Sequence, residues 1–285
     1  MTLRWPTLIV PAGAVFALFF VVPFAIFVSY GFFETRPYGR VGDEVTFQNF
    51  ITFFTDRLYA AVTLRSLSIS LKVVLITIVI AFPTAYFLVR TRSKIIRFLI
   101  PLIFISSFVS VVIRSLGWVI ILQSGGPINQ VLQTLNILHA PLRLLNNEGG
   151  VVIGIVQFVL PLALLSFIGI LQTIPQTYEE AALSLGARPF KVFLRVIFPL
   201  SAPGIASVAI VVFSLTMSTF TTVVILGGGR VLTLPLLIYQ EIIHNVNYPF
   251  ASAISLLLVA GVLLVNVSLG AATRAVTPWA RGGEQ

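Results

Sequence analysis

The sequence predicts an all-α, polytopic membrane protein with six transmembrane helices. Of its 285 residues, 58% are hydrophobic and only 9% are charged, whereas a soluble domain carries roughly 25% charged residues. The apolar residues form continuous runs, and a run of roughly 20 apolar residues is long enough to cross a bilayer as a helix. The strands of a transmembrane β-barrel would instead alternate apolar and polar residues, which excludes that class.

Six apolar runs are expected to span the membrane within a single transmembrane domain, residues 1–285. They lie at about 8–33, 64–89, 98–122, 150–172, 203–226 and 250–272. The first run is longer than the roughly 7–15 apolar residues of a signal peptide, so it is expected to be retained as the first transmembrane helix. Between the third and fourth runs, Pro127 begins a segment with helical apolar spacing, which predicts a short helix along the membrane surface.

Lysine and arginine are concentrated in the loops on one side of the predicted membrane. These residues are Arg4, Arg90, Arg92, Lys94, Arg97, Arg188, Lys191, Arg195, Arg274 and Arg281. Because cytoplasmic loops carry an excess of lysine and arginine, this side is expected to be the cytoplasm, and both termini to be cytoplasmic. The net charge of +9 therefore reflects topology, and no nucleic-acid partner is expected.

The residues that usually carry catalysis or bind metals are scarce. There is no cysteine, which excludes disulfides, thiolate metal sites and cysteine nucleophiles. His139 and His244 fall in separate loops, so no metal site is expected. The sequence contains no G-x-x-x-x-G-K-[ST] phosphate loop, no H-E-x-x-H and no G-x-S-x-G. We therefore expect a chain that is not an enzyme and binds no cofactor of its own.

The loop at 173–199 is polar, and it contains the segment "TYEEAALSLGARPFKVFLRVIFP". Thr177 and Glu180 have the spacing of a capping box, which predicts a helix with Thr177 as N-cap. Gly186 fits the residue that follows the end of that helix, and Pro189 fits the first turn of a second helix.

The second helix is expected to run to about Ile197, with Pro199 and Pro203 separating it from the fifth membrane-spanning run. One interpretation is a well-capped loop with no further role. The other is a rigid cytoplasmic projection, because the small side chains of Ala181 and Ala182 let a helix insert closely into the groove of a partner.

This segment closely resembles the E-A-A-x-x-x-G…I-x-L-P loop of the permease subunits of ABC importers that use a binding protein. The matching residues are Glu180, Ala181, Ala182, Gly186 and Pro199. The departures are Val196, Phe198 and Arg188, which stand where the family usually has Ile, Leu and a small capping residue. The resemblance extends over about 60–270, the core permease region.

The resemblance implies a type I ABC importer permease fold in the bacterial inner membrane. In that family the loop at 177–199 carries the coupling helix, which docks on a cytoplasmic ATPase subunit. The implied docking residues are Tyr178, Glu179, Glu180, Ala181, Ala182, Gly186, Ala187, Arg188 and Pro189. The implied partners are a second permease subunit, identical or different, two ATPase subunits that bind ATP and Mg²⁺, and a periplasmic substrate-binding protein.

Three further segments resemble the spermidine/putrescine branch of these permeases: "SSFVSVVIRSLGWVIIL", "PLRLLNNEGGVVIGIVQFVLPL" and "LTMSTFTTVVILGGG". This implies a polyamine or a related amino compound as cargo, although relatives also carry amino or phosphonate compounds and ferric iron. Candidate residues of the substrate path are Arg114, Trp118, Gln157, Thr216, Ser218, Thr219 and Thr222. The alternatives are that Arg114 reaches the membrane interface and that the hydroxyl groups only pack helices together.

No acidic residue lies deep within a predicted span, which mildly opposes a polyamine. Carboxylates for such a cation would come from a second permease subunit, or from Glu148 and Glu241 near the outer mouth. A secondary transporter would need coupling-ion carboxylates or inverted repeats, and the spans contain neither. A purely structural membrane protein would have no use for the capped projection.

Overall fold

The computed structural model describes residue 11 and residues 13–36, 41–91, 94–137 and 140–276. Within these residues, six helices are long and apolar enough to cross a membrane. They are Gly13–Tyr30, Arg57–Arg90, Val111–Thr134, Glu148–Gln172, Pro189–Ser218 and Tyr248–Thr273. The predicted all-α membrane fold is confirmed. Residues 8–10 and 12 of the first predicted run lie outside the described residues.

The chain divides into two compact units, which are described separately. Unit 1 comprises Met1–Thr63 and Leu234–Gly261, and unit 2 comprises Leu64–Thr233 and Val262–Gln285. Two long helices, α4 (Arg57–Arg90) and α14 (Tyr248–Val276), contribute one end to each unit.

Unit 1 contains a small antiparallel hairpin that the sequence did not reveal. Its strands are β1 (Phe33–Thr35) and β2 (Val41–Val45), paired with Phe33 opposite Val45. The buried Asn49 holds the hairpin, because its Nδ2 donates to the carbonyl oxygens of Gly31 (3.1 Å) and Phe33 (2.9 Å). The other elements are the π-helical turn η1 (Ala17–Val21), α2 (Val22–Tyr30), α3 (Gln48–Thr55) and α13 (Leu234–Ile243).

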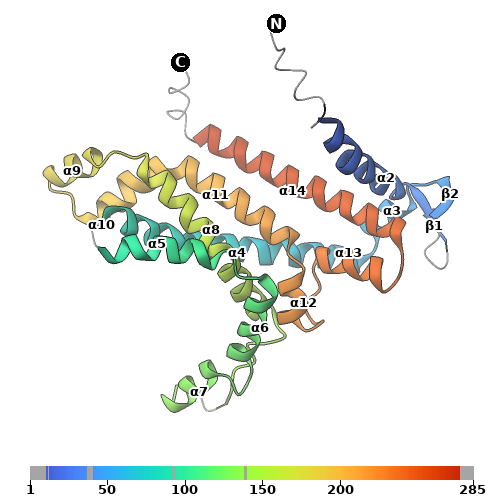
Figure 1. Cartoon of the computed structure of the whole chain (residues 1–285), viewed down its shortest axis with the longest axis horizontal. Helices are drawn as coiled ribbons and strands as arrows, with labels where there is room; N and C mark the ends of the chain where they lie inside the picture. The colour runs from blue at the N-terminus through green and yellow to red at the C-terminus, as the bar shows by residue number, and fades with distance from the viewer. Residues whose placement is uncertain (1–10, 12, 37–40, 92–93, 138–139, 277–285) are drawn as a thin grey trace, which may run out of the picture. The chain divides into compact units, whose positions relative to one another are not determined.

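Unit 2 is built around α8 (Glu148–Gln172), whose most apolar window is 61% buried, against at most 39% in the other candidate spans. α8 packs against α11 and α12, as the ribbons show (Figure 1). Glycine permits this close approach, because a Cβ at Gly154 or Gly204 would collide with Leu226 or Ile170. The other elements are α5 (Lys94–Ser106), α6 (Val111–Leu122), α7 (Pro127–Thr134), α9 (Thr177–Ser184), α10 (Pro189–Val192), η3 (Phe193–Ile197), α11 (Phe198–Ser218) and α12 (Thr221–Gly227).

The predicted boundary between the second loop helix and the fifth span is wrong. Residues 189–218 form one helical segment, with Pro199 and Pro203 inside it. The π-helical turn η3 precedes Pro199, and Phe198 N–H bonds to Phe193 O, five residues back. This wider turn accommodates a proline that would otherwise collide with the carbonyl four residues earlier. The predicted span 203–226 is instead interrupted at 219–220, where Thr219 is extended.

The third predicted span, 98–122, is also interrupted. α5 ends at Ser106 and α6 begins at Val111, after Ser110 adopts an extended ψ of 135°. The predicted short helix after Pro127 is confirmed as α7, with this proline in its first turn, and its position along the membrane surface stays a prediction.

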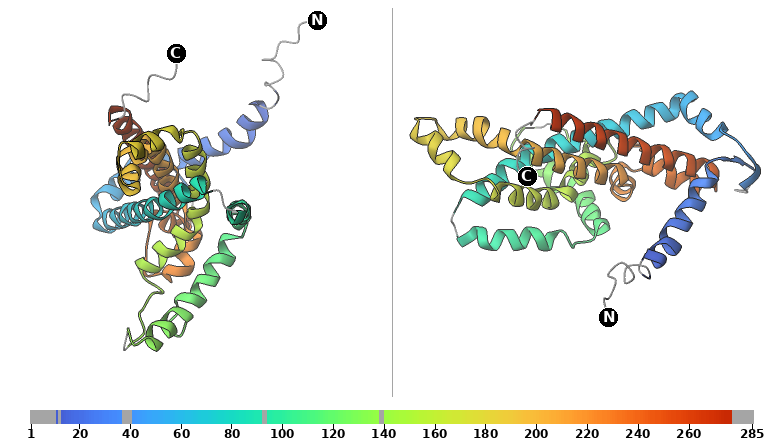
Figure 2. Two further views of the ribbon diagram at one scale, coloured as in Figure 1. Left: turned by 90° about the vertical axis from the view of Figure 1, so that its left-hand side faces the viewer. Right: turned by 90° about the horizontal axis from the view of Figure 1, so that it is seen from above.

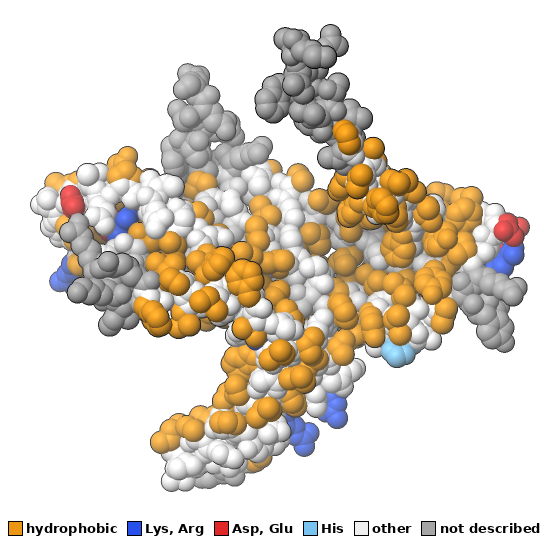
Figure 3. Space-filling view, viewed as in Figure 1, with side chains coloured by type: hydrophobic (Ala, Val, Ile, Leu, Met, Phe, Trp, Pro, Cys, Tyr) orange, Lys and Arg blue, Asp and Glu red, His pale blue; other side chains and the backbone are white. Residues whose placement is uncertain are grey.

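Apolar side chains cover much of the molecular surface, as expected for a protein that lies in lipid. On η1 and α2, exposed residues include Phe16, Phe19, Phe20 and Phe24. Figure 3 shows hydrophobic side chains gathered over α2 and α6, with the charged side chains near the ends of the elements.

Candidate functional site

The loop at 173–199 forms a projection of two short helices, α9 and α10. No residue of α9 is buried, and α9 forms the tip of the projection (Figure 2). Four large side chains on α9, on α10 and in the turn between them are exposed: Tyr178 by 53%, Leu183 by 45%, Leu185 by 89% and Phe190 by 71%. An exposed apolar group of this kind, rimmed by polar residues, is typical of a protein-binding surface.

The start of α9 differs from the predicted capping box. Gln176 stands at the N-cap with helical backbone angles, and no side chain caps the helix. The N–H groups of Glu179 and Glu180 instead bond to Gln176 O at 2.9 and 3.0 Å. A side-chain cap requires an extended backbone at the N-cap residue. Because Gln176 is already helical, neither Thr177 nor Glu180 caps the helix.

The end of α9 has the predicted glycine geometry. Gly186 adopts φ +83°, a conformation that glycine adopts without strain. Its N–H bonds to Leu183 O at 2.9 Å, and Ala187 N–H bonds to Ala182 O at 3.1 Å. These two bonds form a Schellman motif, which closes the C-terminus of a helix. The chain then turns sharply toward α10.

α10 begins as predicted with Pro189 at its first position, and Arg188 at the N-cap is extended. Arg188 makes no capping hydrogen bond with its side chain, which agrees with the absence of the small capping residue there. Val192 is buried and fixes one face of α10, while Arg188 and Lys191 remain exposed.

An ion pair holds α9 to the end of α4. Glu179 Oε1 accepts from Arg90 Nε at 2.6 Å, and Glu179 Oε2 accepts from Tyr86 Oη at 2.8 Å. Arg90 Nη2 also donates to Ile174 O at 3.1 Å. The Arg90 and Glu179 side chains are only 15% and 12% exposed. We call Tyr86, Arg90 and Glu179 the clamp.

The sequence patterns do not predict the clamp. They indicate Arg90 only as a topological charge and Glu179 only as a docking residue beside Glu180. In the structure, Glu179 reaches α4 while Glu180 is exposed. A usable signal was present, because two adjacent carboxylates of a helix lie about 100° apart around its axis and so have different surroundings.

The hydroxyl groups of the predicted substrate path are mostly engaged within their own helix. Thr216 Oγ1 donates to Val212 O, and Ser218 Oγ and Thr219 Oγ1 donate to Leu215 O. Thr222 differs, because it is buried and receives a 3.5 Å hydrogen bond from Ser115 of α6. No interaction between the described residues gathers the four hydroxyls into one lining.

Arg114, on α6, contacts α8. Its guanidinium lies 5.4 Å from the ring centroid of Phe158 on α8, within cation–π range. Its Nε and Nη1 are buried and have no hydrogen-bond partner within the described chain. Trp118 and Gln157 are both half-buried on the same two helices, α6 and α8. The structure therefore groups Arg114, Trp118, Gln157 and Thr222 on neighbouring helices.

The two acidic residues expected near the outer mouth have different surroundings. Glu148, at the start of α8, is paired with Lys72 of α4. Glu241 of α13 is 8% exposed and lines a cavity of unit 1. It takes part in no ion pair among the described residues.

Comparisons with known proteins agree on the family. Residues 49–282 match the family "Binding-protein-dependent transport system inner membrane component". The chain is 32% identical to the spermidine/putrescine transport system permease protein PotB of Haemophilus influenzae, with 84% of each chain covered. It is 29% identical to the molybdenum transport system permease protein ModB of Mycobacterium bovis, with 85% of this chain and 90% of the relative covered.

A solved structure shows the same fold. The chain matches a bacterial alginate ABC transporter in complex with an alginate pentasaccharide-bound periplasmic protein, with a TM-score of 0.79, 17% identity and coverage of 95% and 94%. The names of these proteins give different cargoes. The comparisons therefore agree on the class of transporter but do not identify the cargo of this chain. The chain belongs to the family of inner-membrane components of binding-protein-dependent transport systems, and it is a multi-pass permease subunit of an ABC importer.

Proposed function

We propose that this permease drives uptake of a small solute by docking the loop at 173–199 on a cytoplasmic ATPase subunit. The observation that carries the proposal is the projection itself, which exposes Tyr178, Leu183, Leu185 and Phe190 and is held by the clamp. A rigid projection with an apolar tip suits a groove in a partner protein.

The connections of the loop support a lever mechanism. On one side, the clamp ties α9 to the end of α4 through Glu179 and Arg90. On the other side, α10 continues through η3 into α11 as one helical segment, 189–218. A force applied to the tip would therefore reach α4 and α11 together. Interfaces that switch between two packings turn such displacements into alternating access.

The proposed complex contains a second permease subunit, identical or different, two ATPase subunits and a periplasmic binding protein. ATP and Mg²⁺ are bound by the ATPase subunits, and both termini of this chain are cytoplasmic. The proposed cargo is spermidine, putrescine or a related amino compound, in line with the similarity to PotB. The alternative is the same import of a phosphonate, an amino acid derivative or ferric iron.

Because the chain has no cysteine, single-cysteine variants give a clean test of docking. In Leu185→Cys, whose position is 89% exposed at the tip, a thiol-to-amine cross-linker should join this chain to the co-purified ATPase subunit. Val131→Cys is the matched control, because Val131 is 56% exposed on α7, on the predicted outer side. A product with Val131→Cys and none with Leu185→Cys would overturn the proposal.

A further inference from the structure

Unit 1 contains a cavity of about 510 Å³ that none of the predicted path residues lines. Its wall is formed by the hairpin, α3, and the residues around the starts of α4 and α14, with Glu241 contributed by α13. This volume lies within the range of about 300–1,000 Å³ that is usual for small-molecule sites. The orientation predicted from the loop charges places the cavity on the outer side.

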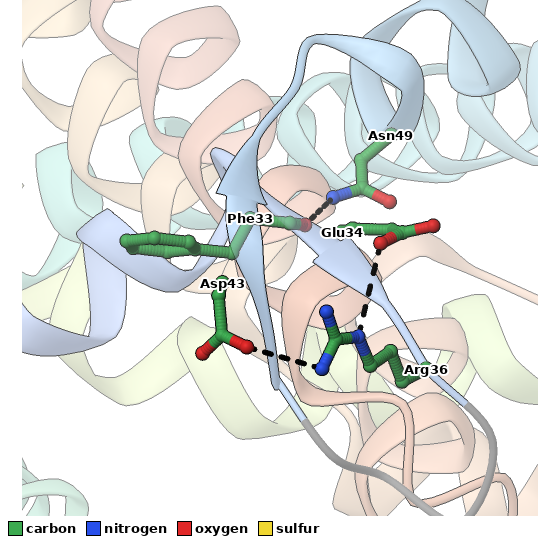
Figure 4. Close-up of polar contacts among 5 residues, drawn as sticks. All are labelled: Phe33, Glu34, Arg36, Asp43 and Asn49. Carbon is green, nitrogen blue, oxygen red and sulfur yellow. Dashed lines mark hydrogen bonds and ion pairs between the residues drawn. The ribbon is translucent and has the colours of Figure 1, made fainter.

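The lining of this cavity is acidic. Among the residues that the structure describes, Glu34, Glu44 and Glu241 line it, and no lysine or arginine does. The neighbouring Arg36 offsets little of this charge, because its Nη1 bonds to Asp43 at 3.1 Å and its Nε lies 3.9 Å from Glu34 (Figure 4). One guanidinium is thus shared by two carboxylates, which leaves the cavity with net negative charge.

Glu241 is the most informative of the three carboxylates. Glu241 is only 8% exposed. Its carboxylate has no hydrogen bond or ion pair among the described residues. Asn247 N–H bonds to Glu241 O, the backbone carbonyl, at 2.7 Å, which leaves the carboxylate free. Glu241 lines the cavity, and a carboxylate without a partner there attracts a cation. Its position on the wall therefore indicates a cationic occupant.

The remaining lining favours an organic cation. Tyr59 and Phe250, whose ring centroids lie 5.0 Å apart, both belong to the lining, and aromatic rings attract ammonium groups. A Ca²⁺ or Mg²⁺ ion needs oxygen ligands that converge to about 2.0–2.6 Å. Within the described residues, no three His, Cys, Asp or Glu side chains converge in this way. Separated carboxylates suit a cation whose charges are themselves separated.

We propose that this cavity binds a linear aliphatic diamine or triamine. Glu241 binds one ammonium group of this ligand, and Glu34 and Glu44 bind another. Tyr59 and Phe250 contact the methylene chain that joins the two ammonium groups. The inference rests on the proposed import function and deepens it, because it assigns the cargo class and an outer site on this chain. It also supplies, outside the spans, the carboxylates that the membrane interior lacks.

The test measures binding of radiolabelled putrescine to the intact transporter complex in nanodiscs, with butylamine and Mg²⁺ as competitors. Putrescine should bind, and butylamine should compete at least tenfold more weakly because it carries one charge. Glu241→Gln, which keeps the shape of the side chain, should weaken binding at least tenfold. Glu241→Asp should retain part of the affinity. Competition by Mg²⁺ at the concentration of putrescine would overturn the proposal.

The matched control is Asp56→Asn, which removes an exposed carboxylate that does not line the cavity and keeps an oxygen acceptor for the Leu58 N–H. Putrescine affinity should be unchanged in this variant. Equal losses in Asp56→Asn and Glu241→Gln would contradict a specific role for the cavity. The Leu185→Cys cross-link separates the two proposals: a cross-link without putrescine binding refutes the cavity alone, and binding without a cross-link refutes the docking loop alone.

Discussion

The clamp and Arg114 are two places in unit 2 where charged side-chain groups are largely buried. They differ in whether the partners of these groups lie within the described chain. In the clamp, Glu179 accepts from both Arg90 and Tyr86. Arg114 has two buried guanidinium nitrogens with no partner in the described chain. A charge that is satisfied within the chain holds the fold together, whereas one that is left unsatisfied requires something from outside it.

From this difference we propose that Arg114 is completed by another molecule. Its guanidinium has the face of Phe158 and no carboxylate, which suits a second permease subunit or an anionic group passing through. The clamp, by contrast, is satisfied within the chain, so we expect its role to be internal: it would fix the angle of α9 for the proposed ATPase partner. The following three substitutions test this comparison.

The largest effect is expected for Glu179→Ala. The substitution leaves Arg90 and Tyr86 without their acceptor, and breaking a buried ion pair costs about 3–5 kcal/mol. Amide hydrogen exchange across 177–187 should accelerate at least tenfold, and uptake should be lost while the chain remains inserted. Glu180→Ala is the control for the exchange measurement, because Glu180 is exposed and caps nothing. Equal exchange in the two variants would refute the clamp.

A smaller effect is expected for Gly186→Val. The backbone at φ +83° is strained for a β-branched residue, at about 1–3 kcal/mol. No atom lies within 4 Å of an added Cβ, so the cost is conformational and the chain should still insert. ATP hydrolysis should then proceed without proportionate uptake. Gly186→Asn, which tolerates this conformation better, should retain more uptake, and unchanged uptake in Gly186→Val contradicts the lever.

The smallest effect on the isolated subunit is expected for Arg114→Gln. Because only the cation–π contact with Phe158 is lost, and no hydrogen bond or ion pair within the described chain, the stability of the subunit in detergent should change by no more than about 1 kcal/mol. Assembly of the permease pair or uptake should nevertheless fall, and Arg114→Lys should fall less. A subunit destabilised as strongly as Glu179→Ala would show that Arg114 is satisfied within its own chain.

Local signals predicted the parts of the loop that depend on local chemistry. Gly186 and Pro189 were placed correctly because a left-handed backbone and a first-turn proline are properties of single residues. Thr177 was misplaced because the capping box assumes an extended N-cap, and Gln176 is helical. The pairing of Arg90 with Glu179, 89 residues apart, depends on tertiary packing, which single-residue signals do not contain.

The membrane spans show the same contrast between local signals and tertiary packing. Hydrophobicity located the six membrane-crossing regions, but it gave no sign of the breaks at 107–110 and 219–220. A continuous apolar run fits a helix and an interrupted helix equally well, and the choice depends on neighbouring helices. The docking, path and partner assignments beyond the family remain predictions.

The π-helical turn η3 has a consequence for the direction in which the projection points. A π turn carries one more residue than an α turn, and each residue of an α-helix rotates the chain by about 100°. Deleting one residue from Phe193–Ile197 would therefore rotate α10 about the axis of α11 by about 100°. The number of residues in this turn thus sets the direction in which the proposed docking face points. A single deletion in the turn would change that direction while every side chain on the face stays the same.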